Sequence, residues 1–176
     1  MVRKSLCLAA FGAAVLATPS LAQTMPPPPP PAATSQAVPF LMTAASSDQY
    51  EIQSSRVALQ KTRRPEIREF ANMLIAHHTK TSADAMAAAK ADRVNAPPPR
   101  LMPAHQKMVD ELKGTSAADF DRVFLAQQLP AHQGALTLMQ GYAASGDKPA
   151  LRQAATGAVP IIQSHIDRIN QLQSGR

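Results

Sequence analysis

Apolar residues recur at spacings of three and four along four long stretches of the chain, and prolines or glycines separate these stretches. This period matches the 3.6-residue turn of a helix that buries one face. The last stretch has the clearest stripe, formed by Leu151, Ala155, Ala158, Ile162, His165, Ile169 and Leu172. No segment shows the alternation of a half-buried strand, so the pattern predicts an all-α protein.

Proline and glycine set the expected ends of the first helices. The first helix is predicted from Phe40 to Lys61, and the second begins at Pro65, where the missing N–H costs nothing. The second helix must end before the three prolines at 97–99. A short helical piece is expected from Pro103 to Leu112.

The third long helix is predicted from Ala117 to about Ala144, with Ser116 as its N-cap and Asp119 three residues later. Pro130 lies inside it and is expected to bend or locally break it. The fourth helix starts near Pro149. Four long amphipathic helices with short linkers predict an antiparallel four-helix bundle over residues 40–173, with a short extra helix between the second and third.

The N-terminus reads as an export signal. Two basic residues precede an apolar run of about eleven residues, and the small-x-small order Ser20-Leu21-Ala22 follows. The run is shorter than the roughly 20 residues that span a bilayer. We therefore expect a signal peptide at 1–22, cleavage near Ala22, and a mature periplasmic or secreted protein without a transmembrane span. The proline-rich stretch 23–39 is expected to be a disordered linker.

Composition narrows the chemistry. The only cysteine, Cys7, falls in the predicted signal peptide, so thiol catalysis and thiolate metal sites are excluded from the mature chain. Without Arg3 and Lys4, 16 basic residues face 12 acidic ones, a net charge near +4. These basic residues are scattered and do not form a stripe, which argues against a nucleic-acid partner.

Three histidines fall on the apolar stripes of three different helices: His78, His132 and His165. Glu51 lies in the first helix. Together they are candidate ligands for one divalent transition metal, Zn, Cu, Fe or Mn. A buried hydrogen-bond network that fixes helix register is the alternative, and a pH-sensing role is a third.

Other candidate groups carry less weight. His77 points about 100° away from His78 on a helix, so it is expected to be exposed or to support the site from behind. His105 is expected to be a lone surface histidine. Met73 and Met139 are possible soft copper ligands, although methionine at helical spacing usually fills the core.

Several runs resemble a family of exported bacterial proteins, the domain-of-unknown-function family forty-one forty-two. These runs are 44–52, 65–71 and 74–78, together with 120–124, Ala131-His132, and Val159-Pro160 with His165. The resemblance spans about 40–172 and implies a ferritin-like bundle. It implies that Glu51, His78, His132 and His165 are kept, whereas the two aspartates usual before the histidines of the second and third helices are replaced by His77 and Ala131.

A di-iron centre is not expected, because such sites need a Glu-x-x-His on two helices. Here the residue three positions before His78 is Ile75, and the residue three positions before His165 is Ile162, so neither helix has the glutamate. The leading hypothesis is a non-enzymatic exported protein that binds an envelope partner or small ligand, with a candidate metal at the four residues. The alternatives are a metal-dependent enzyme of unknown reaction, and a structural or adaptor domain whose proline spacer reaches a partner.

Overall fold

The computed structural model describes residues 25–175, and all its long elements are helices. The elements are the short 3-10 helix η1 (Pro31–Thr34), α1 (Ala37–Lys61), α2 (Pro65–Ala91), α3 (Pro103–Gly114), α4 (Phe120–Ser145) and α5 (Pro149–Gln173). The all-α prediction is confirmed, including the short extra helix. The predicted signal peptide and its cleavage point lie outside the described residues.

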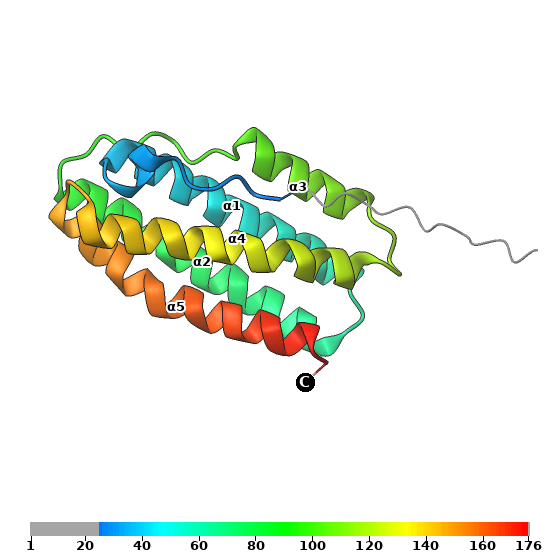
Figure 1. Cartoon of the computed structure of the whole chain (residues 1–176). Coiled ribbons are helices and arrows are strands. Elements are labelled where there is room, and N and C mark those ends of the chain that lie inside the picture. The colour runs from blue at the N-terminus through cyan, green and yellow to red at the C-terminus, as the bar shows by residue number, and fades with distance from the viewer. Residues whose placement is uncertain (1–24, 176) are drawn as a thin grey trace, which may run out of the picture.

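The four long helices form a bundle in which every neighbouring pair is antiparallel (Figure 1). Short turns join α1 to α2 and α4 to α5. At the end of the bundle that carries the turn from α4 to α5, Phe40 near the start of α1 stacks on Tyr142 near the end of α4, with ring centroids 4.0 Å apart. Asp92, which follows α2, accepts hydrogen bonds from the backbone N–H groups of Ala150 and Leu151 at the start of α5. The long connection that carries α3 crosses from the end of α2 to the start of α4.

Two predicted boundaries move. The Ser116 hydroxyl does bond Asp119, donating to its carboxylate at 2.8 Å, but α4 begins only at Phe120. The proline-rich stretch is expected to be disordered, yet η1 packs on α1 and α4 with Ala33 fully buried, and α1 already begins at Ala37. Burial of apolar side chains in this stretch supplies the packing that proline content alone does not reveal.

Neither internal proline interrupts its helix. Helix α4 runs through Pro130 and α5 runs through Pro160. The break considered for Pro130 is therefore wrong. One missing backbone hydrogen bond is outweighed by the tertiary packing of the flanking turns, since Leu129 packs against the core and Ala131 is buried.

A polar layer divides the core. One apolar cluster occupies the end of the bundle near Phe40, Tyr142 and Leu151, and a second occupies the end near Phe70, Phe124 and Ile169. The buried polar side chains of the four long helices lie between these two clusters or at their boundary: Ser46, Asp48, Glu51, Ser54, Ser55, His78, Gln127, Gln128, His132 and His165. The packing of the four helices therefore encloses a polar layer within the core. Separately, none of the described helices has the length and apolar content needed to cross a membrane.

Candidate metal centre

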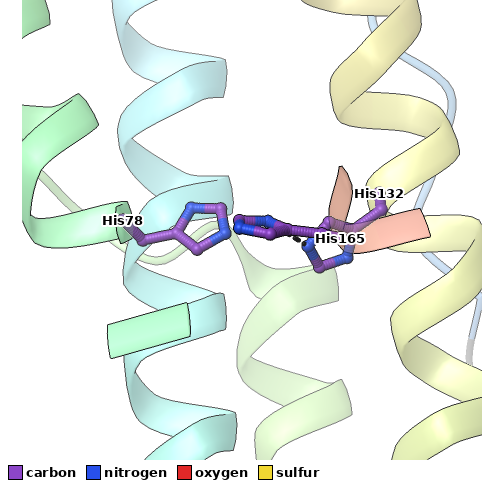
Figure 2. Close-up of side chains that lie close together, drawn as sticks. All are labelled: His78, His132 and His165. Carbon is purple, nitrogen blue, oxygen red and sulfur yellow. Dashed lines mark hydrogen bonds between the residues drawn. The ribbon is translucent and has the colours of Figure 1, made fainter. Parts of the chain in front are cut away.

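The three predicted histidines converge in the middle of the bundle (Figure 2). His78 comes from α2, His132 from α4 and His165 from α5, and each is at most 4 % exposed. One ring nitrogen from each lies within 4.8 Å of the others. Each histidine occupies a core position of its helical stripe, so packing of the apolar faces is what brings the rings together.

Protein acceptors fix the outer nitrogens of two rings. His78 Nδ1 donates to Asp48 Oδ1 at 2.7 Å, and His132 Nδ1 donates to the backbone carbonyl of Gln128 at 2.9 Å. A carboxylate and a carbonyl can only accept here, so both neutral rings carry their lone pair on Nε2. Metal-binding histidines are oriented in this same way by carboxylates and carbonyls behind them.

His165 joins this arrangement through both ring nitrogens. Its Nδ1 lies 3.2 Å from His132 Nε2, and its Nε2 lies 2.8 Å from His77 Nδ1. Since His132 Nε2 holds a lone pair, His165 Nδ1 donates to it and accepts in turn from His77 at its other nitrogen. A chain of hydrogen bonds thus runs from the buried rings to the half-buried His77.

Four buried polar atoms of the layer have no hydrogen-bond partner: Glu51 Oε2, Ser55 Oγ, Gln128 Oε1 and His78 Nε2. Of these, only His78 Nε2 belongs to the histidine cluster. An unpaired buried acceptor costs about 1–3 kcal/mol of stability. A bound cation would give the His78 lone pair a partner, so the unpaired nitrogen fits a metal ligand better than a purely structural histidine.

Burial and neighbouring charges shift the pKa values of the cluster. Burial, with His78 and His77 nearby, lowers the pKa of His165 to about 3. Burial, with His78 and His165, holds the pKa of His132 well below its usual value. Burial also acts to lower the pKa of His78, but the hydrogen bond and charge of Asp48 and the charge of Glu51 outweigh it and raise that pKa. At neutral pH, His132 and His165 are neutral imidazoles, the form that binds metal.

Glu51 lies behind His132. Its Oε1 is 3.6 Å from His132 Nδ1, the nitrogen that faces the Gln128 carbonyl. It is not in the group whose ligand atoms lie within 4.8 Å of one another. Burial raises the pKa of this carboxyl to about 7, although His78 acts to lower it. Of the four predicted ligands, the structure brings three together and places Glu51 beside them.

The raised pKa of Glu51 predicts that Glu51→Gln stabilises the metal-free protein at pH 8 by about 3 kcal/mol. The folded state keeps a proton that the unfolded chain loses, so wild-type stability falls between about pH 4.5 and about pH 7. Glutamine stays neutral and avoids this loss. Urea unfolding at pH 4.5 and pH 8 measures it, with the exposed Glu69→Gln as control. Equal pH dependence in Glu51→Gln and wild type would contradict the assignment.

The other two histidines of the chain, His105 and His77, can be compared with their predicted positions. His105 is buried, bonds Ser46 at 2.7 Å and stacks on Tyr50, so the prediction of a surface histidine is wrong. Its helix α3 packs on α1, which turns that side inward. His77 is half-buried and bonds Nε2 of His165, so it supports the cluster from behind.

Met73 packs against the core at the end of the bundle near Phe70, whereas Met139 lines a small cavity beside His78 and His165. Only Met139 is therefore close enough to the cluster to concern its chemistry.

Asp48 is the residue that the sequence reasoning missed. Its carboxylate accepts from His78, Thr81 and Ser82, and it is 7 % exposed. It stands three residues before Glu51 and so on the same face of α1, which is the signal that could have found it. The aspartate that usually precedes the histidine of the second helix is replaced here by His77. Asp48 of α1 gives His78 an acidic partner instead.

Solved structures with the same fold include metal-bound proteins. CopM in the Cu(II)-bound form aligns with a TM-score of 0.66 at 20 % identity, covering 80 % of this chain and 98 % of that chain. CopM in the Cu(I)-bound form aligns at 0.65 and 19 % identity, over 80 % and 96 %. A DUF305 fragment from Deinococcus radiodurans aligns at 0.67 and 17 % identity, over 85 % and 100 %. At these identities the likeness shows the fold.

A comparison with curated proteins found no match. A family model does match, over residues 22–172, a span that contains all of the bundle except the last residue of α5, and all three clustered histidines. The chain therefore belongs to the family described as a domain of unknown function, DUF4142.

Proposed function

We propose that this protein binds one copper ion between His78, His132 and His165, outside the cytoplasm. The observation that carries the proposal is the set of three ring nitrogens within 4.8 Å, one of them, His78 Nε2, buried without a partner. The order of charged, apolar and small residues in 1–22 supports export. Binding, without a reaction, is the activity that these residues support.

The geometry of the rings fits an ion of this size. Nitrogens that each lie ~2.0–2.1 Å from a tetrahedral metal are roughly 3.4 Å apart, so the rings need to close by at most about 1.4 Å. The proton between His132 Nε2 and His165 Nδ1 must leave this space. It can move to His165 Nε2 if His77 shifts its own proton from Nδ1 to Nε2, so that His165 Nε2 becomes the donor and His77 Nδ1 the acceptor of the bond that now spans 2.8 Å. The chain thus frees both lone pairs without charging a ring.

Copper is favoured over zinc by the charge of the site. The three rings offer no negative charge and Glu51 has a pKa of about 7, so the negative charge beside the site comes from the single buried carboxylate that is bonded to His78, that of Asp48. A monovalent ion costs less to bury there than a dication. Imidazole suits copper as well as zinc, and CopM, which shares the fold, has been solved with Cu(I), Cu(II) and Ag.

Metal analysis tests the proposal. Protein exported by its natural host, or metal-free protein reconstituted with Cu(I), is expected to hold about one copper per chain, the capacity of a single four-coordinate site. His78→Gln and His132→Gln should each abolish binding, with circular dichroism used to confirm that the helices remain.

The matched control is His105→Gln, since His105 is a buried histidine outside the cluster. It should keep its copper. A copper-free wild type, or copper lost equally in His105→Gln, would overturn the proposal and leave the cluster as a structural network.

A further inference from the structure

A groove of about 510 Å³ separates α2 from α5 on the surface of the bundle. Small side chains such as Ala88, Ala154 and Gly157 line most of it, and Lys80 pairs with Asp84 among its lining residues. Short side chains on both helices leave the space open, because nothing longer fills the gap between the two backbones.

The groove adjoins a second, smaller cavity of about 20 Å³ that reaches the histidine cluster. Both hollows share six lining residues: Ala44, Asp48, Thr81, Met139, Ala158 and Ile161. Beyond this shared wall, the smaller cavity is lined by His78 and His165. In the described part of the chain, Met139 provides the only sulfur atom on either lining.

The unpaired nitrogen of His78 marks where this passage leads. His78 lines the smaller cavity, is 4 % exposed, and its Nε2 has no partner. Asp48 is occupied by His78, Thr81 and Ser82, which leaves the Met139 thioether as the donor at the junction. A cation that sheds its water needs a ligand at each step, since an uncompensated charge is costly in such surroundings.

We propose that a soft monovalent ion, copper(I) or silver(I), enters through the groove between α2 and α5 and passes the thioether of Met139 to reach His78. This inference rests on the proposed function and adds a route and a residue that selects the ion. Thioether sulfur binds Cu(I) well, whereas Zn²⁺ prefers imidazole, carboxylate and thiolate. Met139 therefore acts on the rate of loading and favours soft ions.

The structure also contains a third hollow, which serves as an internal control. It is about 30 Å³ in volume and is lined by residues of α1 and α4, including Ser47 and Leu138, by Pro26, Pro27 and Pro29, and by His105 of α3, whose Nδ1 is bonded to Ser46. Ser47 and Leu138 line the cavity beside the histidines as well. The proposal assigns entry to the α2–α5 side and none to this one.

The first test is the rate at which metal-free protein takes Cu(I) from a chromophoric bicinchoninate complex in a stopped-flow instrument. Met139→Leu conserves volume and should fold. It should slow Cu(I) uptake about tenfold, the scale of losing one ligand in a transit step, and leave the final stoichiometry unchanged. Zinc uptake should be unaffected. Met108→Leu, a buried methionine of α3 outside both linings, should behave as wild type.

The second test compares two glycines that line the two hollows, Gly157 on α5 and Gly134 on α4. A Cβ placed at either meets nothing within 4 Å, so both positions have room for the first atom of a larger side chain. Gly157→Trp should slow Cu(I) uptake and Gly134→Trp should not. Equal rates for Met139→Leu and wild type, or slowing by Gly134→Trp alone, would overturn the inference while the copper site stands. A wild type that takes up no copper would overturn the proposed function as well.

Discussion

Saturating copper(I) is expected to raise the free energy of unfolding of the wild-type protein by about 4 kcal/mol when free metal exceeds the dissociation constant about a thousandfold. The physical reason is that the folded chain holds three ring nitrogens within 4.8 Å, whereas the unfolded chain has no preformed site. For a chain of this size the melting temperature should rise by roughly 10 °C. Thermal unfolding at graded, buffered Cu(I) concentrations measures the effect.

Asp48→Asn refines this prediction. The carboxylate of Asp48 orients His78 through its Nδ1, and such supporting groups typically change metal affinity 10–100-fold. We expect the stabilisation by copper to need about tenfold more metal in Asp48→Asn, and to vanish in His78→Gln. His105→Gln should retain it fully. A copper-induced shift that persists in His78→Gln would place the ion elsewhere on the protein.

The histidines could be predicted from the sequence because they occupy apolar positions. His165 stands among isoleucines in the regular stripe of α5, and His78 and His132 replace apolar residues at the spacing of their helices. Once the four helices pack antiparallel, core positions must face one another. The bundle and three of the four proposed ligands therefore follow from periodicity.

What periodicity does not fix is the axial level at which side chains meet. It gives the face of a helix but not how far one helix slides along another. For this reason the sequence pattern groups Glu51 with the histidines, whereas the structure places it behind His132, and Asp48, one turn earlier, bonds His78 instead. The prediction for His105 fails for a related reason: the short helix α3 packs on α1 and buries His105, and the pattern of α3 alone does not indicate this contact.

The same burial that keeps the rings neutral makes the protein sensitive to acid. Burial lowers the pKa of His165 to about 3, against 6.5 for an exposed histidine. As pH falls below 6.5, the ring of His165 takes up a proton in the unfolded chain but not in the folded one, so the free energy of unfolding drops until about pH 3. His132 contributes in the same direction, while Glu51, with its raised pKa, opposes both between about pH 7 and about pH 4.5.

His165→Gln isolates one part of this balance. Between pH 6.5 and pH 4, metal-free His165→Gln should lose about 3 kcal/mol less stability than the wild type, since its amide does not titrate. His165 also helps to lower the pKa of His132, so its removal reduces the acid sensitivity of His132 in the same direction. Urea unfolding at the two pH values measures the difference, whatever the variant's baseline stability. His105→Gln should recover less, because His105 keeps contact with the surface at 8 % exposure whereas His165 has none. An unchanged acid response in His165→Gln would mean that the folded ring takes up a proton as readily as the unfolded one, so that burial does not keep it neutral for a metal.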